Sequence, residues 1–399
     1  MELTLHTLLF RDGADTVGRM VVDLTSDVAE AIDRAALRRV DRAIGELRRG
    51  EAVLVSDAEG RAVLARAAEA LVAPDIATLQ QQAATRPALA VSGRRAQALG
   101  LSVAPERTAL LTLEDGWTVE RVRHVADPTQ PLPADLLARV QVATADPDSS
   151  AEGAAVALAK LARLLPAVVV APVAAGQKPD AVARRHDLMQ VTASDIQDHR
   201  RQAVRTLARI VEASVPLEDC EQTRIIAFRP SDGGPEHLAL VIGEIDTRRP
   251  VLVRLHSECF TGDLLGSLRC DCGPQLRGAV QEIAARGGGV ILYLSQEGRG
   301  IGLINKLRAY RLQDGGLDTL AANEALGFEA DERIYLPAAE MLRSLGIGQV
   351  QVMTNNPDKL RQLARCGVEV VERVPHIFPS NDHNAAYLRT KAERAGHLF

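Results

Sequence analysis

The sequence predicts an α/β protein of two domains, and three observations support this prediction. The chain has 399 residues, which exceeds a single domain of roughly 100–200 residues. Its second half alternates short apolar runs with amphipathic stretches, the pattern of strands and helices in layered α/β folds. The two halves also differ in composition, because residues 1–200 contain no cysteine and all five cysteines follow them.

In the second half, several predicted helices end at glycine, which readily adopts the left-handed conformation of a helix C-cap. Gly287, Gly315 and Gly367 each follow an amphipathic stretch in this way. The predicted helices of this half cover residues 275–286, 304–313, 338–345, 358–366 and 385–395, and the predicted strands cover 251–255, 289–294, 349–354 and 368–373.

The first half shows fewer clear elements. Its predicted helices cover residues 30–49 and 154–165, its predicted strands cover 52–55, 88–91 and 167–170, and a loop is expected at 145–150. A charged helical stretch at 199–215 is expected to connect the halves. A boundary near residue 205 gives domains 1–205 and 206–399.

Composition narrows the class of protein. Apolar residues make up 46% of the chain and charged residues 25%, which is typical of soluble globular proteins. The net charge of −5 argues against a nucleic-acid partner, although it leaves room for a local basic pocket. The apolar N-terminus is interrupted at Arg11 and Asp12, and the longest apolar stretch, 164–175, contains two prolines. We therefore expect a cytoplasmic protein that does not bind membranes.

Three cysteines lie within fourteen residues, with the spacing C-x10-C-x-C formed by Cys259, Cys270 and Cys272. Three thiolates can hold a zinc ion and leave its fourth position open to water, whose pKa the zinc lowers toward 7. Alternatively, the zinc is structural and its fourth ligand is His256 or Cys366. A third possibility is three buried free cysteines.

The segment around these cysteines, RLHSECFTGDLLGSLRCDCGPQL at residues 254–276, resembles the signature of GTP cyclohydrolase II, the first enzyme of riboflavin biosynthesis. The resemblance continues to the end of the chain and implies the mixed α/β fold of that family, a homodimer, and a catalytic Zn²⁺ on the three cysteines. It also implies hydrolysis of GTP to formate, pyrophosphate and 2,5-diamino-6-(5-phosphoribosylamino)pyrimidin-4(3H)-one, with Mg²⁺ neutralising the pyrophosphate.

The same resemblance assigns further site residues. The glycine-rich block QEGRGIGL at 296–303 lets backbone amides approach a ligand, and Arg299 offers a planar fork for phosphate. Tyr310 and Asp331 are implied to be catalytic, as is Arg333, whose simplest role is electrostatic because guanidinium stays protonated. The residues implied to bind GTP are Arg254, Leu255, His256, Ser257, Glu258, Gln275, Glu297, Gly298, Arg299, Thr319, Thr354 and Lys359. The tail at 390–398 also resembles the family, whereas Asp358 departs from it.

The first half resembles a degenerate 3,4-dihydroxy-2-butanone-4-phosphate synthase and is expected to share its α/β fold. Residues 38–61 resemble the opening of that domain and residues 179–200 its ending. No Arg-Glu-Asn-Glu block occurs in residues 1–200, and Ala62 and Ala151 stand where acidic and histidine motifs are expected. Alanine cannot ligate Mg²⁺. We therefore hypothesise that this domain is inactive and serves as a dimerising or regulatory scaffold.

Two other functions fit the sequence. A cyclohydrolase II paralogue could stop at the formylated pyrimidine or serve another nucleotide pathway, since a shared fold does not fix the pathway. A non-catalytic, zinc-stabilised GTP sensor is the other alternative. The presence of Tyr310, Asp331 and Arg333 together argues against the sensor, because a sensor needs none of them.

Overall fold

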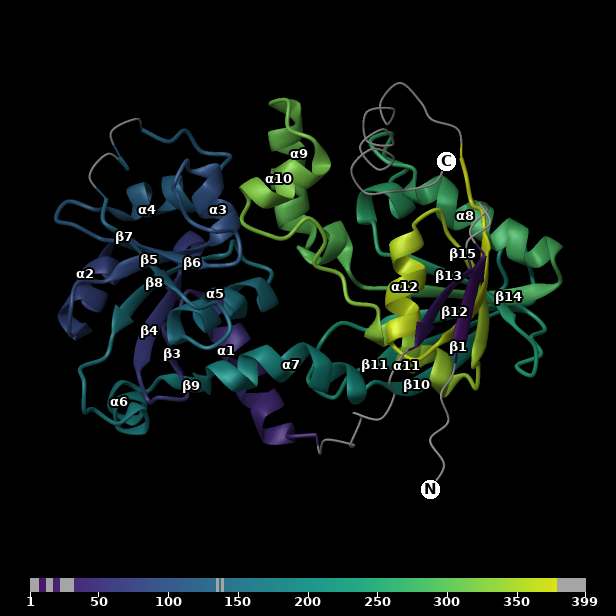
Figure 1. The fold of residues 1–399 in the computed structure, drawn as a ribbon, viewed down its shortest axis with the longest axis horizontal. Coiled ribbons are helices and arrows are strands. Elements are labelled where there is room, and N and C mark those ends of the chain that lie inside the picture. Colours follow the sequence, from purple (N-terminus) through teal and green to yellow (C-terminus); the bar gives the residue numbers. More distant parts are fainter. Residues whose placement is uncertain (1–6, 12–16, 22–31, 134–135, 138–139, 379–399) are drawn as a thin grey trace.

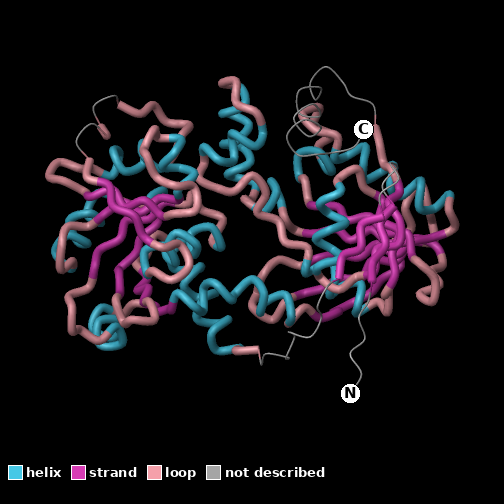
Figure 2. The backbone as a smooth tube through the Cα atoms, viewed as in Figure 1, coloured by secondary structure: helices cyan, strands magenta, loops and turns pink. Residues whose placement is uncertain are grey.

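The computed structural model describes residues 7–11, 17–21, 32–133, 136–137 and 140–378. Two seven-stranded sheets dominate it, one in each half of the chain, and a small hairpin of β1 (Thr7–Arg11) and β2 (Val17–Val21) forms a third sheet. Figure 2 shows the strands gathered in two groups, with helices around them. Across these ranges we find no helix with the length and apolarity needed to cross a bilayer. The predicted helix at 385–395 and the family-like tail at 390–398 lie outside the described residues.

The first sheet has the strand order β7-β6-β5-β8-β4-β3-β9, and its neighbours are antiparallel except for the parallel pair β3–β9. Its strands are β3 (Val53–Ser56), β4 (Ala62–Ala67), β5 (Ala88–Ser92), β6 (Thr108–Thr112), β7 (Val142–Ala145), β8 (Ala167–Pro172) and β9 (Met189–Thr192). The central strand β8 reads AVVVAP and is almost entirely buried. The three strands predicted from the sequence, at 52–55, 88–91 and 167–170, correspond to β3, β5 and β8.

Helices cover this sheet. They are α1 (Arg34–Arg49), the 3-10 turn η1 (Ala68–Ala70), α2 (Ala73–Gln82), α3 (Gly93–Ala98), α4 (Val119–Ala126), α5 (Ala151–Leu161), α6 (Pro179–His186) and α7 (Ala193–Arg205). Helix α1 begins where the Asp33 carboxylate accepts two backbone N–H bonds, and it ends at Gly50 with φ of 85°, as N-caps and C-caps require. The predicted helix at 154–165 is confirmed with shifted bounds, because Ser150 caps α5 earlier.

The connector is only partly the predicted helix. Helix α7 ends at Arg205, and residues 208–214 form strand β10 (Ala208–Ser214), which pairs antiparallel with β11 (Thr223–Arg229). The prediction of a helical stretch through residue 215 is therefore wrong beyond Arg205. The exposed charged residues of β10 suit either structure, and pairing with β11, the next strand along the chain, decides between them. This strand is the edge of the second sheet.

The second sheet has the order β10-β11-β12-β14-β13-β15-β16. Pairs from β10 to β14 are antiparallel, and pairs from β14 to β16 are parallel. The remaining strands are β12 (His237–Gly243), β13 (Val251–Ser257), β14 (Gly288–Leu294), β15 (Gln349–Met353) and β16 (Glu369–Val374). The four strands predicted for this half correspond to β13–β16, which confirms the mixed α/β fold.

The helical elements of this half are η2 (Phe260–Leu264), α8 (Cys272–Ala285), the 3-10 turn η3 (Glu297–Gly300), α9 (Leu303–Asp314), α10 (Thr319–Ala325), α11 (Leu336–Ser344) and α12 (Pro357–Arg365). The four predicted helices within the described range are α8, α9, α11 and α12. Helices α9 and α10 stand between the two sheets in Figure 1. They contribute Ala309, Ala322 and Leu326 to a hydrophobic core that the first domain otherwise builds, and Phe328 follows them there.

Candidate metal centre and nucleotide cavity

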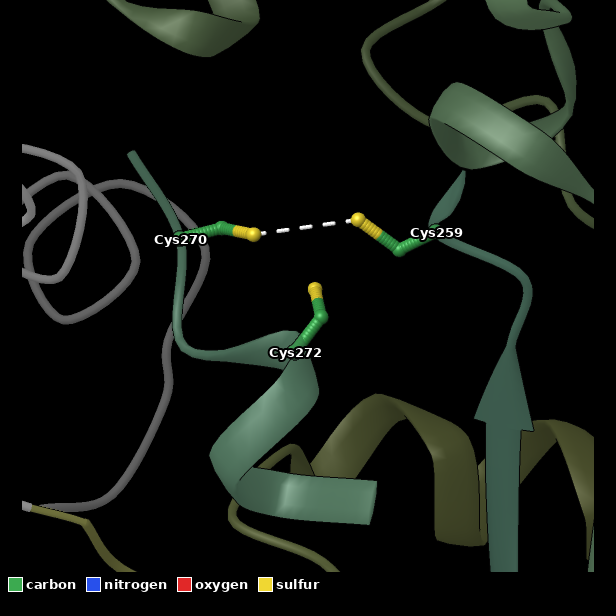
Figure 3. Close-up of side chains that lie close together, drawn as sticks. All are labelled: Cys259, Cys270 and Cys272. Atoms are coloured by element: carbon green, nitrogen blue, oxygen red, sulfur yellow. Dashed lines mark hydrogen bonds between the residues drawn. The ribbon is translucent and has the colours of Figure 1, made fainter. Parts of the chain in front are cut away.

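The three clustered cysteines come together at the end of a parallel strand. Cys259 follows β13, Cys270 lies in the loop after η2, and Cys272 begins α8. Figure 3 shows the three sulfur atoms pointing toward one another, with 3.7 Å between the Sγ atoms of Cys259 and Cys270. Two thiolates on a tetrahedral ion with metal–sulfur bonds of about 2.3 Å lie about 3.8 Å apart. The cluster therefore has the geometry of a tetrahedral metal site.

A glycine allows this convergence. A Cβ atom on Gly262 would lie 2.7 Å from Cys270 Sγ and 3.0 Å from Cys259 Sγ, far inside van der Waals contact. The backbone of η2 thus passes directly against the sulfur atoms. Only glycine fits this position without displacing them.

Among the described residues, the group that could hold a metal at this cluster consists of the three cysteines, with no fourth protein ligand. His256 directs its Nε2 at the Asp263 carboxylate, 3.0 Å away, and stacks on Tyr293. Cys366 caps the end of α12 and packs against the core of the second sheet. Neither His256 nor Cys366 is therefore placed to act as the fourth ligand of a closed structural site. A tetrahedral ion held by the three cysteines would keep one coordination position open.

A buried lysine adjoins the cluster. Lys306 Nζ lies 3.1 Å from Cys259 Sγ and 2.9 Å from a Glu297 oxygen. Burial alone would lower the pKa of Lys306, but the Glu297 hydrogen bond and the charge on Cys259 raise it overall. Hydrogen bonds from the other two thiols, together with Lys306, lower the pKa of Cys259. A thiolate is thus stabilised at Cys259, and thiolates are the form that binds metals.

The thiol cluster forms part of the wall of a cavity of about 1150 Å³, a volume that includes its opening to solvent. Among the described residues, six basic side chains line it and two carboxylates do, those of Glu258 and Glu297. The basic residues are Arg254, Arg269, Arg299, Lys306, Arg333 and Lys359. A chain with a net charge of −5 therefore concentrates positive charge where a polyanion could bind.

Strand ends and the glycine-rich turn position these groups. Arg254 is buried on β13, donates to the Met353 carbonyl at 3.0 Å and contacts the Gln275 side chain, whereas its Nε has no hydrogen-bond partner among the described residues. Burial lowers its pKa to about 10. Gly298 and Arg299 both have φ of 63°, so the turn η3 folds back on itself. This conformation is unusual for arginine and brings Arg299 to the cavity.

Arg333 is held in place by a carboxylate. Asp331 accepts hydrogen bonds from the Arg333 backbone N–H at 3.0 Å and from its Nε at 2.9 Å, and Arg333 also reaches Ser257 Oγ at 3.3 Å. Burial raises the pKa of Asp331, but the charge of Arg333 more than offsets that effect, so the pKa lies below its usual value. Asp331 is therefore charged near neutral pH and fixes the guanidinium plane.

Tyr310 reaches the thiol cluster through Thr261, since its hydroxyl lies 3.3 Å from Thr261 Oγ1. Thr261 Oγ1 is in turn 3.8 Å from Cys259 Sγ. Burial raises the pKa of Tyr310, so its hydroxyl keeps its proton. Tyr310 thus places a neutral donor beside the metal centre.

The structure brings most of the sequence-predicted residues to this cavity and leaves two out. Those that line it are the three cysteines, Tyr310, Arg333, Arg254, Leu255, Ser257, Glu258, Gln275, Glu297, Gly298, Arg299, Thr319, Thr354 and Lys359. His256 lies behind the wall against Asp263, and Asp331 contacts Arg333 rather than the cavity. Both carboxylate oxygens of Glu297 already accept hydrogen bonds, from Phe260 and Lys306 among others.

Sequence reasoning missed six polar residues of the described lining, which are Arg269, Lys306, Gln313, Asn323, Asn355 and Asn356. Two of them carried a usable signal. Lys306 precedes Tyr310 by four residues on the same helix, and side chains at that spacing share a face. Arg269 precedes Cys270 directly, and its guanidinium carbon lies 5.0 Å from the Tyr310 ring centroid.

Comparison with known proteins identifies the family. A family profile described as GTP cyclohydrolase II matches residues 208–375. The chain is 56% identical over 386 residues to "GTP cyclohydrolase-2" of Azospirillum brasilense, an alignment that covers 95% of this chain and 100% of that protein. The chain belongs to the GTP cyclohydrolase II family. The cysteine cluster and basic cavity lie inside the matched region.

Other similar proteins align with less of the chain. "Riboflavin biosynthesis protein RibBA" of Bacillus mycoides (strain KBAB4) is 47% identical over 253 residues, which cover 62% of this chain and 64% of that protein. Among solved structures, the two-domain 3,4-dihydroxy-2-butanone 4-phosphate synthase RibBX from A. baumannii aligns with 84% of this chain and 99% of its own, at 21% identity and a TM-score of 0.34.

Proposed function

We propose that the protein is a zinc-dependent GTP cyclohydrolase II that catalyses the first step of riboflavin biosynthesis. It would convert GTP and water to formate, pyrophosphate and 2,5-diamino-6-(5-phosphoribosylamino)pyrimidin-4(3H)-one. One observation carries the proposal. Three thiols with tetrahedral spacing and an open fourth position lie in the wall of a predominantly basic cavity. Zinc held by Cys259, Cys270 and Cys272 would supply a Lewis acid and an activated water for opening the imidazole ring.

The basic side chains of the cavity would bind the triphosphate. Arg299 and Lys359 line it from the glycine-rich turn and from the first turn of α12, and a helix N-terminus also favours an anion. Mg²⁺ would neutralise the pyrophosphate as it leaves. Glu258 and Gln275 are suited to reading the guanine edge, because both line the cavity near the cysteines.

Arg333 would stabilise charge at the α-phosphate. Its guanidinium is held by Asp331, and a fixed fork of donors costs little reorganisation when charge develops on phosphate oxygens. Asp331 is deprotonated and can accept a proton. Tyr310, which keeps its proton beside the cysteines, would orient water or the opened intermediate.

We further propose that residues 1–205 form a separate domain without synthase activity, and that residues 206–399 form the cyclohydrolase domain. Ala62 and Ala151 are buried apolar residues, so two positions expected to ligate Mg²⁺ offer no oxygen. The Azospirillum brasilense relative aligns through both halves, and its name gives the cyclohydrolase alone. Formation of 3,4-dihydroxy-2-butanone 4-phosphate from ribulose 5-phosphate by the purified protein would overturn this part.

We propose a cytoplasmic homodimer. Free thiols that bind metal suit a reducing compartment. Apolar side chains are exposed on η2, on the loop that follows it and on α9, and contiguous exposed apolar groups mark association surfaces. They are Phe260, Leu264, Leu265, Leu268, Ile304 and Leu307. Sedimentation analysis of the wild type and of Leu265→Glu tests this surface, and an unchanged dimer in the variant would count against it.

The activity test uses purified full-length protein with GTP, Mg²⁺ and Zn²⁺, and products are followed by mass spectrometry. Cys270→Ser should abolish product formation, whereas the matched variant Cys366→Ser, which changes a cysteine outside the cluster, should retain it. Release of formate with the diaminopyrimidine supports the full reaction. A formylated pyrimidine alone would favour the paralogue that stops early, and unchanged GTP would favour the sensor.

A further inference from the structure

The loop that carries Asp331 and Arg333 is attached to side chains of the first domain. Glu332 lies between those two residues, and its carboxylate accepts a hydrogen bond from Lys160 Nζ at 2.7 Å. Arg200 lies 3.6 Å from the other carboxylate oxygen and 3.4 Å from the Glu332 carbonyl. Lys160 belongs to α5 and Arg200 to α7. Both cations therefore come from helices that pack on the first sheet.

Glu332 joins three segments and is itself buried, with 9% of its side chain exposed. Its carboxylate also accepts the Glu329 backbone N–H at 3.0 Å, and its own N–H donates to the Arg299 carbonyl at 3.0 Å. Burial raises the pKa of Glu332, but Lys160 more than offsets that effect, so the pKa lies below its usual value. A buried carboxylate that loses its cation is strongly destabilised, so this loop depends on Lys160.

A second contact from the same part of the first domain reaches the glycine-rich turn. Arg163, just past the end of α5, donates to the Ser295 carbonyl at 3.1 Å and accepts from the Asn305 side chain at 3.0 Å. These two partners flank the turn on its two sides. Arg163 has φ of 58°, a conformation that non-glycine residues adopt only where the surroundings hold it. The end of α5 thus contacts both the loop that supplies Arg333 to the cavity and the turn that supplies Arg299.

We propose that Lys160 is a positioning residue for the cyclohydrolase reaction, and that it orients Asp331 and Arg333 by fixing Glu332 between them. The inference rests on the proposed function. Lys160 does not line the cavity, so it acts through Glu332 and not on substrate. The first domain thereby contributes to catalysis in the second half of the chain without chemistry of its own.

The test compares Lys160→Met, Glu332→Gln and their double variant in the full-length protein loaded with zinc. Because misplacement of a catalytic group by about 1 Å can cost up to about 100-fold in rate, we expect Lys160→Met to lower kcat by at least about tenfold. The KM for GTP should be unchanged if the loop acts in the chemical step. Lys160→Arg should restore most of the activity, and the double variant should be no slower than the slower single variant.

Arg94→Ala is the matched control, because Arg94 forms ion pairs across the same interface with Glu324 and Glu329 but none with Glu332. It should keep kcat within about twofold of the wild type, as expected for partly exposed ion pairs. An unchanged kcat in Lys160→Met, an equal loss in Arg94→Ala, or additive losses in the double variant would each overturn the proposal.

Amide hydrogen exchange over residues 331–333, which Arg94 does not contact, gives a readout independent of turnover. Exchange should accelerate in Lys160→Met and remain at the wild-type rate in Arg94→Ala. If the wild type fails to consume GTP, the proposed function fails, but exchange still tests whether Lys160 holds the loop. Wild-type exchange rates in Lys160→Met would overturn the contact whatever the activity.

Discussion

A single methyl group placed on Gly262 should empty the metal site while every ligand remains. In Gly262→Ala the new Cβ would lie 2.7 Å from Cys270 Sγ and 3.0 Å from Cys259 Sγ. Since non-bonded heavy atoms prefer separations of about 3.5–4.0 Å, one sulfur must move by about 1 Å. Metal–ligand distances vary by only about 0.2 Å in sound sites. We therefore expect loss of bound zinc and of GTP turnover together.

Metal analysis of the protein purified with zinc, combined with turnover of GTP, measures this effect. Gly348→Ala is the matched control, because a Cβ there meets nothing within 4 Å. Overpacking costs typically about 1–3 kcal/mol, so Gly262→Ala should remain folded by circular dichroism. Wild-type zinc content and turnover in Gly262→Ala would refute the reasoning, because the thiols would then not be confined by the η2 backbone.

Three further outcomes are expected. Arg333→Lys keeps the positive charge but loses the planar guanidinium, so steady-state turnover of GTP should fall about 100-fold while the zinc content stays unchanged. Wild-type kinetics in this variant would contradict the role of the guanidinium. Phe328→Ala removes a side chain that is 1% exposed and should lower the free energy of unfolding in urea by about 3–5 kcal/mol; a loss below about 1 kcal/mol would show that it is not a core residue. Burial, reinforced by neighbouring arginines, lowers the pKa of His237 and of His376 to about 4. In the unfolded chain histidine binds a proton near pH 6.5, whereas these two histidines in the folded protein bind one only near pH 4. The free energy of unfolding should therefore be highest above pH 6.5 and should fall by up to about 3 kcal/mol per residue as the pH falls toward 4. If the free energy of unfolding in urea does not change over this pH range, the lowered pKa values of both histidines are contradicted.

The sequence analysis predicts the parallel strands of the second sheet and misses the antiparallel strands β10–β12, of which β10 has the weakest signal. Strands β13–β16 are short segments with apolar residues, and helices separate each from the next, so their pattern is local. Strand β10 is mostly exposed and carries Arg209 and Glu212, so nothing within it indicates a strand. Its conformation comes from pairing with β11, because strand formation depends on the partner more than on propensity.

The candidate site also has features that the sequence predicts and features that it does not. The three cysteines lie in one short segment, so their spacing alone indicated a metal site. The contacts that hold the loop of Asp331 and Arg333 join residues far apart in the sequence, such as Lys160 and Glu332, which are 172 positions apart. No local pattern encodes such a pair, and only the packing of α5 against the loop reveals it.

The shared core has a consequence for how such a chain can change over evolution. Leu326 and Phe328 fill the hydrophobic core of the first domain, and Ser92 Oγ donates to the Gly327 carbonyl between them at 2.6 Å. A deletion that ends near residue 205 would uncover that apolar surface and remove Lys160 and Arg200, the two cations that pair with Glu332. A lineage that does not use residues 1–205 for chemistry must therefore still keep them folded against the second half. Substitutions can accumulate elsewhere in residues 1–205, while the face toward α9 and α10 stays under selection for the packing of the second half.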